Sequence, residues 1–264
     1  MHTETIKIIC RCCGFKEANH SISGTILGNA ISYYQCNYCG YVQTENPYWL
    51  DRAYSSPINA SDTGVMMRNL KNTQVVLVSL WLLGDIKGGV LDFAGGYGVL
   101  VRLLRDYGVD AFWMDRFSIN LLARGFEYQN EKIKLVSAFE VFEHLVSPEK
   151  ELADMLKIAP NVILSTEIIP SPIPKQVDWW YFGKDHGQHI GFFRVETLKK
   201  LAAKHGKHLV TDNKTYHLFS EHPISQIRFS ITMRLSGLIF RVLRLFLKSK
   251  TLSDNRKMLS ADVD

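Results

Sequence analysis

The chain has 264 residues, which is long enough for one large domain and a small accessory module. Hydrophobic residues make up 46% and charged residues 22%, the balance of an ordinary globular protein, so a largely disordered chain is excluded. The formal net charge of +5 is mild and favours anionic ligands, and without clusters of interleaved basic and aromatic residues we expect no nucleic-acid partner.

The sequence shows neither a targeting segment nor a membrane-spanning segment. The opening residues 1–13 lack the apolar core of a signal peptide, and no run reaches the roughly 18 apolar residues that a transmembrane helix needs. We therefore expect a cytoplasmic protein whose thiols stay reduced.

All five cysteines lie near the start of the chain, and four of them form two C-x-x-C pairs, Cys10/Cys13 and Cys36/Cys39. Each pair is followed by glycine, which lets the backbone turn tightly and point its N–H groups at the sulfur atoms. This pattern predicts a structural zinc ion held by four thiolates in a small ribbon. Disulfides, an iron–sulfur cluster and unrelated buried thiols are the alternatives, and Cys12 could compete with Cys10 or Cys13 for the metal.

Three further segments follow the cysteines. Residues 44–64 are rich in Pro, Ser, Asn and Asp and predict a connector with a short helix around 48–54, and residues 66–84 carry apolar side chains at helical spacing. Strand and helix patterns alternate from residue 85 onward. The predicted domains are a zinc ribbon at 1–44, a linker with leading helices at 45–84, an α/β domain at 85–233 and a C-terminal helix and tail at 234–264.

The alternating part predicts the fold class. Strands are expected at 89–96, 109–115, 133–142, 161–169, 207–220 and 226–235, and helices at 97–108, 147–160 and 195–206. This alternation predicts an α/β fold with a doubly wound, mostly parallel sheet that is covered by helices on both faces.

A glycine-rich turn, residues 91–98 (LDFAGGYG), separates the first expected strand from the first expected helix. Small residues there let a ligand approach the backbone, and the helix begins with free N–H groups. Asp115 ends the next strand and could accept both hydroxyls of a ribose. Because the turn begins with Asp92 and has no G-x-G-x-x-G pattern for a pyrophosphate, adenosylmethionine is favoured over NAD. A tight turn without any ligand is the alternative.

These residues resemble class I S-adenosylmethionine-dependent methyltransferases, and more narrowly a zinc-ribbon branch found among sugar- and polysaccharide-associated enzymes. In that class the turn reads [D/E]-x-G-x-G-x-G. Asp92, Gly96 and Gly98 match it, Ala94 replaces the first glycine, and Asp115 matches the ribose-binding acid. The residues that the resemblance assigns to the cofactor are Asp92, Ala94, Gly95, Gly96, Tyr97, Gly98, Asp115, Ala138, Phe139 and Glu140.

A second motif, residues 138–145 (AFEVFEHL), matches the E-V-x-E-H pattern that follows the fourth strand in this class. By that analogy, residues 137–140 line the cofactor. Only residues 116–132 separate the second expected strand from the next, so the usual third strand and its adenine-side acid are short or missing.

Residues 178–194 (DWWYFGKDHGQHIGFFR) are the expected substrate side. Trp179, Trp180 and Tyr181 could form a wall against a sugar or could cap the core. Methyl transfer requires the acceptor to lose a proton, which an imidazole can remove. The resembling sugar methyltransferases place a histidine of similar context near the acceptor, so His189 is the expected general base. A histidine packed in a core or loop is the alternative reading of His189.

Two other side chains are candidates for the catalytic site, His186 and Glu143. His144 is expected to be a structural partner of Glu143 at the end of a strand. The predicted reaction is methyl transfer to a small-molecule or glycan-linked acceptor, with a nucleotide sugar or a polysaccharide end as the preferred choice. The alternatives are a zinc-ribbon scaffold with a degenerate methyltransferase fold and an NAD-dependent sugar enzyme.

Residues 234–248 predict a basic amphipathic helix. Arg234, Arg241, Arg244 and Lys248 fall on one stripe of this helix, and leucine, isoleucine, valine and phenylalanine fall on its other faces. Such a helix can lie on an anionic membrane surface or pack on the enzyme or a partner. We therefore expect a cytoplasmic protein that could contact the membrane peripherally, and the sequence predicts no oligomeric state.

Overall fold

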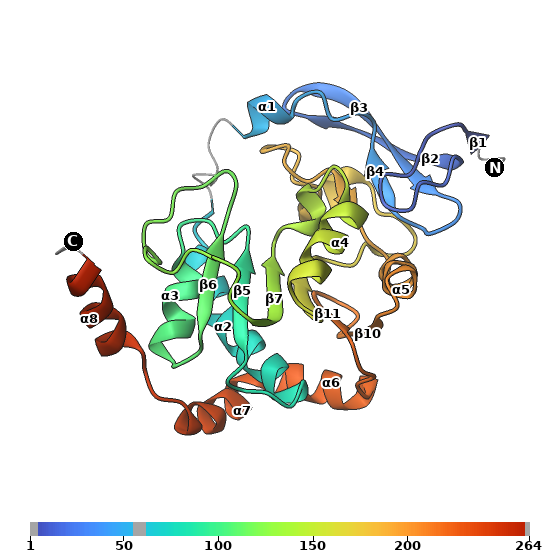
Figure 1. Cartoon of the computed structure of the whole chain (residues 1–264). Coiled ribbons are helices and arrows are strands. Elements are labelled where there is room, and N and C mark those ends of the chain that lie inside the picture. The colour runs from blue at the N-terminus through green and yellow to red at the C-terminus, as the bar shows by residue number, and fades with distance from the viewer. Residues whose placement is uncertain (1–4, 55–61, 262–264) are drawn as a thin grey trace. The chain divides into compact units, whose positions relative to one another are not determined.

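The computed structural model describes residues 5–54 and 62–261 (Figure 1). Part of the predicted connector, residues 55–61, and the last residues of the predicted tail, 262–264, lie outside the described residues. The chain divides into two compact units, each assembled from segments that are distant in sequence. Unit 1 comprises residues 1–59, 140–154 and 164–219, and unit 2 comprises residues 60–139, 155–163 and 220–264.

Unit 1 contains an antiparallel sheet that extends the cysteine-bearing segment. Its hydrogen-bonded order is β1 (Thr5–Ile6), β2 (Ala18–Ile26), β3 (Asn29–Cys36), β4 (Val42–Thr44) and β9 (Gly191–Phe192). Leu27 and Gly28 join β2 to β3 with φ angles of 49° and 84°, the left-handed pair that a two-residue hairpin turn requires. The last strand comes from much later in the chain, so the ribbon is built on residues beyond the N-terminal segment.

The hydrophobic core of unit 1 mixes the ribbon with these later residues. Its buried members are Ile26, Ile31, Tyr33, Val42, Trp49, Ile169, Tyr181, Phe182, Ile190 and Phe192. The short helix α1 (Leu50–Ala53) follows Trp49, whose indole N–H donates to the carbonyl of Gly187 at 2.8 Å. Folding of the ribbon and folding of residues 169–192 therefore depend on each other.

The remaining secondary structure follows the predicted α/β alternation. The helices are α2 (Val65–Leu82), α3 (Val99–Asp106), α4 (Pro148–Ile158) and α5 (Val195–Lys204), and the strands are β5 (Gly89–Phe93), β6 (Ala111–Met114), β7 (Ile133–Phe139), β8 (Val162–Ser165), β10 (His208–Thr211) and β11 (Tyr216–Ser220). The sheet order is β10-β11-β8-β7-β5-β6, and β5 pairs in parallel with both β6 and β7. The predicted mostly parallel α/β sheet is confirmed, and β8 has the fully buried side chains typical of such a sheet.

The described residues 116–132 form no strand, as the short spacing in the sequence predicted. One parallel bridge, Trp113 to Glu127, stands in place of a strand beside β6. The loop is instead fixed by local contacts, in which the backbone carbonyl of Tyr97 accepts the N–H groups of Leu121 and Leu122 at 3.3 and 3.0 Å.

Two predictions about late strands were wrong. Residues 207–220 form two strands, because Asp212 accepts the backbone N–H groups of Lys214, Thr215 and Tyr216 and so makes a turn between β10 and β11. Residues 226–235 form helix α6 (Gln226–Arg234), which begins where the Ser225 hydroxyl accepts the N–H of Arg228. The apolar residues of this segment alternate with period two, which favoured a strand, and the helix leaves some of them exposed.

The single helix predicted at 234–248 is also interrupted. Helix α7 (Ser236–Leu243) runs into a short 3-10 turn, η4 (Arg244–Phe246), and Leu247 is extended. A further helix, α8 (Thr251–Ala261), follows within unit 2. None of the described helices combines the length and hydropathy that crossing a bilayer requires.

An ion-pair network ties α8 to α3. Buried Asp254 accepts from Arg105 Nε and Nη2 at 2.7 and 2.8 Å and from Arg102 Nη2 at 2.8 Å. The guanidinium of Arg105 is itself buried, so the carboxylate of Asp254 stabilises a charge that has little access to water. The bidentate geometry makes the pair directional and fixes where α8 docks.

We expect Asp254→Asn to lower the free energy of unfolding by about 3 kcal/mol, because it removes the buried bidentate partner of Arg105 and leaves as counter-charge, among the described residues, only the longer contact to the half-exposed Asp110 at 3.4 Å. Asp106→Asn is the matched control, since this carboxylate also contacts Arg102 but is 41% exposed, and a loss below about 1 kcal/mol is expected. Urea denaturation measures both values. Equal losses would show that burial of the Asp254 pair does not matter.

Candidate functional site

The glycine-rich turn of unit 2 forms between β5 and α3, as predicted. Ala94, Gly96 and Gly98 have φ angles of 56°, 54° and 83°. Ala94 therefore occupies a left-handed position where glycine carries no steric cost, which explains why the resembling enzymes have glycine there. Gly98 is the residue at which α3 begins.

Gly95 must be glycine for a different reason, which is the lack of space around its Cα atom. A Cβ atom at this position would lie 2.8 Å from Trp113 Cδ1 and 2.9 Å from Asp92 Oδ2. The turn thus holds the backbone close to the carboxyl group of Asp92, which leaves no room for a side chain. This close approach is the feature that a cofactor cradle needs.

Asp92 is buried at the end of β5 and faces the neighbouring strand β7. The Ser137 hydroxyl donates to Asp92 Oδ1 at 2.9 Å. Burial raises the pKa of Asp92 to about 7, the hydrogen bond from Ser137 opposes this rise, and the charge of Asp115 adds to it. The carboxyl group is therefore poised to ionise near neutral pH, and a cationic ligand beside it would favour the ionised form.

Asp115 lies just beyond β6 and binds the turn directly. Its Oδ2 accepts the N–H of Gly96 at 2.9 Å, and its Oδ1 accepts the N–H groups of Phe117 and Ser118 at 2.7 and 2.8 Å. The indole of Trp113 donates to the carbonyl of Gly96 at 2.8 Å. Asp115 thus contacts the turn that begins at Asp92, and the two acids predicted for the cofactor lie at the same edge of unit 2.

The other predicted cofactor residues divide between the two units. Ala138 and Phe139 end β7, next to the Asp92–Ser137 pair in the strand register, and they belong to unit 2. Glu140 belongs to unit 1, where its N–H donates to Ser165 Oγ at 2.9 Å and its Oε1 accepts from the same hydroxyl at 2.6 Å. Glu140 also has a φ angle of 55°, a strained conformation that sets the exit from the strand.

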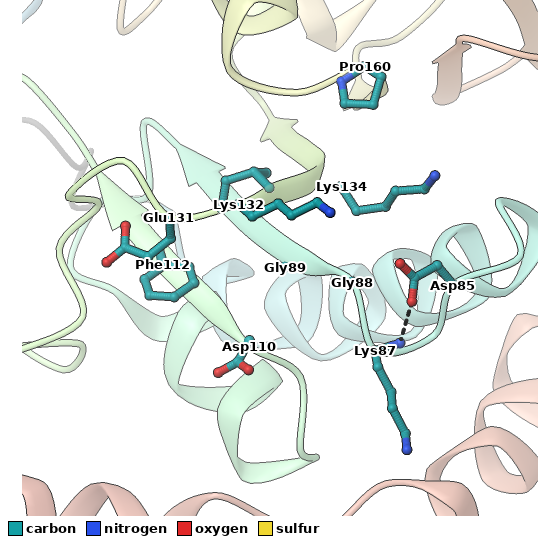
Figure 2. A pocket seen from close by; sticks show the side chains of 11 residues that line it. Asp85, Lys87, Gly88, Gly89, Asp110, Phe112, Glu131, Lys132, Lys134 and Pro160 are labelled. Atoms are coloured by element: carbon teal, nitrogen blue, oxygen red, sulfur yellow. Dashed lines mark hydrogen bonds between the residues drawn. The ribbon is translucent and has the colours of Figure 1, made fainter.

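A cavity of about 550 Å³ lies at a different edge of unit 2 (Figure 2). It is lined at the starts of β5, β6 and β7, by residues that include Gly89, Asp110, Lys132 and Lys134. Ligands of open parallel α/β sheets bind at the carboxyl ends of the strands, where Asp92 and Asp115 lie. The cavity in Figure 2 is therefore not the cofactor site that the sequence predicts.

The three predicted catalytic side chains and His144 come together in unit 1. The rings of His144 and His186 each lie 4.8 Å from the ring of His189, and His144 Nε2 lies 3.9 Å from Glu143 Oε1. The two segments meet because the N–H of Ile190 donates to the carbonyl of Glu143 at 2.9 Å. The E-V-x-E-H motif and the aromatic-histidine segment thus form one cluster.

His189 is buried and held by its Nδ1 atom, which lies 2.6 Å from the carbonyl oxygen of Tyr181. A carbonyl can only accept, so Nδ1 carries the proton and Nε2 of the neutral ring keeps its lone pair. Burial lowers the pKa of His189 to about 4, with the Tyr181 carbonyl acting in the opposite direction. The ring is therefore neutral at physiological pH.

Glu143 is fully buried in the same cluster. Neither carboxylate oxygen has a hydrogen-bond partner among the described residues, although the hydroxyls of Tyr181 and Thr166 are near enough to lower its pKa. Burial outweighs them and, with the charge of Glu140, raises the pKa of Glu143 to about 8. Glu143 is therefore mostly protonated at neutral pH.

Tyr54 is a neighbour of this cluster that the sequence did not reveal. Its hydroxyl lies 3.0 Å from His144 Nδ1, and no local pattern links two residues so far apart in the chain. Burial lowers the pKa of His144 well below its usual range, and the neighbouring histidines add to this effect. Glu143, His144 and His189 each offer a ligand atom within 4.8 Å of the others, so this group of two histidines and one carboxylate could hold a metal ion.

The aromatic wall expected at 179–181 does not form as one surface. Tyr181 is buried in the core of unit 1, Trp179 packs on the rings of Tyr181 and Phe192, and Trp180 is 77% exposed. The core-capping alternative therefore holds for Tyr181. Trp180 is left as the exposed ring of this segment.

The four cysteines of the two C-x-x-C pairs also converge. Their sulfur atoms lie within 4.8 Å of one another, with Cys10–Cys39 at 3.7 Å and Cys13–Cys36 at 3.6 Å. A tetrahedral zinc with Zn–S bonds of about 2.3 Å separates its sulfur ligands by nearly this amount. Cys12 is buried but lies outside the set. The donor chemistry and the spacing both fit the predicted structural zinc.

Comparison with known proteins adds a family match. A family model described as a methyltransferase domain matches residues 73–211. Among similar solved structures is a 1,6-didemethyltoxoflavin-N1-methyltransferase from Burkholderia thailandensis, with 14% identity and a TM-score of 0.49, covering 75% of this chain and 97% of that chain. Another is magnesium protoporphyrin IX methyltransferase from Synechocystis PCC 6803, with 17% identity and a TM-score of 0.42, covering 64% and 90%. No curated protein sequence matches the chain significantly.

Proposed function

The chain belongs to the methyltransferase domain family and is an S-adenosylmethionine-dependent enzyme, and from this premise we propose that it methylates a sugar-type small molecule with His189 as general base. The observation that carries the base assignment is the hydrogen bond from His189 Nδ1 to the Tyr181 carbonyl, which leaves Nε2 free to accept a proton. The scaffold alternative does not explain why a neutral imidazole and an unpaired carboxyl are buried together.

We assign the cofactor to the turn of unit 2. The free N–H groups at the start of α3 and the backbone of residues 94–98 cradle the nucleoside and methionine parts, and Asp115 accepts ribose hydroxyls. Asp92 faces the cationic end of the cofactor, where its carboxylate offsets positive charge. Ala138, Phe139 and Glu140 complete the proposed set. When bound, the cofactor supplies an electrophilic methyl group on a sulfonium.

The raised pKa of Asp92 makes cofactor affinity depend on pH. Below pH 7 this carboxyl is protonated in the free protein, and a cationic ligand must displace the proton. Above pH 7 it is already ionised, so the cost disappears. We expect the Kd for S-adenosylmethionine to rise up to about tenfold from pH 7 to pH 6 and to change little from pH 7 to pH 8. Titration calorimetry measures it.

Asp92→Asn is the control for this dependence. The amide keeps a hydrogen-bonding shape beside Ser137 but cannot ionise, so binding should be weaker and nearly independent of pH across the same range. A variant that keeps the wild-type pH dependence would assign that dependence to a different group and remove Asp92 from the cationic end of the cofactor.

The proposed base works by geometry. Methylation of a hydroxyl makes its oxygen strongly acidic as the new bond forms, so a neutral imidazole with a low pKa is basic enough to take the proton. Tyr181 orients the His189 ring through Nδ1, and the Tyr54 hydroxyl lies 3.0 Å from Nδ1 of the neighbouring His144. We propose His186 and Glu143 as further members of the catalytic site.

Three observations support a sugar-type acceptor. The sequence resembles the sugar-associated branch in its zinc ribbon, the net charge of +5 suits a phosphate-bearing substrate, and Trp180 presents an exposed ring in the substrate segment. The test is a screen of labelled methyl transfer to nucleotide sugars, free sugars and small acceptors without a sugar. Turnover confined to the last group would overturn the sugar assignment and leave the enzyme class intact.

A further inference from the structure

We propose that residues 226–248 of unit 2, which comprise α6, Leu235, α7, η4 and the two residues after η4, form a docking surface for an anionic phospholipid bilayer. We call this surface the C-terminal face. Its exposed apolar members are Ile227, Ile231, Leu235, Leu238, Val242, Leu245 and Phe246, and its basic members are Arg234, Arg241, Arg244 and Lys248. The proposal concerns where the enzyme works and is independent of its acceptor and its general base.

The apolar members of the C-terminal face lie at helical spacing. Ile227 and Ile231 share one side of α6, and Leu238 and Val242 share one side of α7, since residues four apart are neighbours on a helix. Each of the seven is between 45% and 76% exposed. Large aliphatic side chains seldom gather on the surface of a protein that has no partner there.

The opposite sides of α6 and α7 are packed against the core of unit 2. Phe229 and Met233 of α6 and Phe240 and Leu243 of α7 are buried in unit 2. The outer apolar side chains are therefore additional to what the fold needs. In α6, which Figure 1 places beside α7, the period-two pattern of the sequence leaves Ile227 and Ile231 exposed while Phe229 and Met233 are buried.

The charge of this region has one sign. Residues 222–253 contain six lysines and arginines and no aspartate or glutamate. Two of these cations are engaged, Arg228 over the ring of Trp81 and Lys250 with Asp110. The four of the C-terminal face are exposed and have no ion pair among the described residues. The face therefore attracts an anionic partner over its whole length.

The chemistry favours lipid over other anionic partners. Leucine, isoleucine, valine and phenylalanine between the cations can enter the boundary between headgroups and acyl chains, whereas nucleic acid is bound through polar groups and stacked rings. A second copy of the chain is disfavoured, because a two-fold contact would bring the same cations together. Since no described helix can cross a bilayer, the contact is peripheral.

The test is sedimentation of the full chain with vesicles. Binding should be at least about tenfold stronger to vesicles that contain phosphatidylglycerol than to phosphatidylcholine alone, and it should weaken as salt is raised. Leu245→Ser with Phe246→Ser, and Arg241→Glu with Arg244→Glu, should each reduce binding about tenfold or more. Thermal melting by circular dichroism should be unchanged, because all four side chains are exposed.

The matched control carries the same change of net charge elsewhere. Lys150→Glu with Lys199→Glu alters two exposed lysines of α4 and α5 and should retain binding. If this control loses as much vesicle binding as the Arg241→Glu/Arg244→Glu variant, net charge alone explains the binding and the proposal is wrong. Binding to duplex DNA without binding to vesicles, or a dimer in ultracentrifugation that the Leu245→Ser/Phe246→Ser variant abolishes, would also overturn it.

Discussion

Replacing His189 by asparagine is expected to lower kcat by about 10² to 10⁴-fold, the range that a general base contributes. The amide nitrogen of asparagine can still donate to the Tyr181 carbonyl, as Nδ1 does at 2.6 Å, while the lone pair of Nε2 is lost. The substitution therefore removes the proton acceptor and keeps the anchoring hydrogen bond. Single-turnover methyl transfer, followed with labelled cofactor, measures the effect.

The pH profile separates a base from a packing residue. Burial lowers the pKa of His189 to about 4, so the ring stays neutral, and kcat at saturating cofactor should not fall between pH 8 and about pH 6. An ordinary exposed histidine would lose activity near its usual pKa of about 6.5. Cofactor affinity in His189→Asn should stay within about twofold of the wild type, since its proposed binding site is the turn of unit 2.

Two outcomes would contradict the base assignment. Full activity in His189→Asn would make His189 a core histidine and leave the methyltransferase class standing. Activity that is lost with a chelator and restored by a divalent metal, in enzyme whose zinc content is unchanged, would make Glu143, His144 and His189 a ligand set instead. His186→Asn compares a second histidine of the proposed catalytic site, and a smaller loss of kcat is expected because its Nδ1 already accepts the N–H of Gln188 and its ring is only half-buried.

The parts of the site that the sequence predicts are those formed by residues close together in the chain. The strand, the acid–glycine turn and the helix after it occupy residues 89–106, so spacing alone fixes which N–H groups point outward. The same holds for the C-x-x-C pairs, where the N–H of Gly14 closes on the carbonyl of Cys10 at 2.8 Å within one knuckle. The geometry of such local motifs follows from the spacing of their residues.

The parts that sequence missed depend on pairing across the chain. Tyr54 meets His144 only because the fold returns residues 142–144 to the end of α1. Strand β9 joins the ribbon sheet through Val42 and Phe192, a pairing that no periodicity encodes. In α6, the hydroxyl of Ser225 and the burial of Phe229 outweigh a strand-like pattern, which tertiary packing routinely does to weak local preference.

Loss of the proposed zinc should unfold the ribbon. Cys36→Ser removes one of four thiolates, and structural zinc contributes about 10 to 16 kcal/mol in small peptide sites, more than a small sheet can lose. We expect zinc content, measured by mass spectrometry, to fall from one ion per chain to below about a tenth. The amide protons of β2 and β3, measured by hydrogen exchange, should lose their protection.

Cys12→Ser is the matched control, because Cys12 is equally buried but lies outside the converging set. It should retain one zinc ion and the wild-type exchange pattern. Loss of zinc in this variant, or full protection of β2 in zinc-free Cys36→Ser, would contradict a four-cysteine structural site.

Loss of zinc should also affect His189, the proposed base, which belongs to the same unit as the ribbon. Strand β9 pairs with β4 of the ribbon, and Gly191 lies so close to Tyr41 that a Cβ atom there would overlap the phenol ring. Arg11, between two of the cysteines, donates to the carbonyl of Ile190, the residue after His189. Because the backbone of His189 is held from the ribbon side in this way, zinc-free enzyme should lose kcat along with ribbon protection, although no zinc ligand contacts the acceptor.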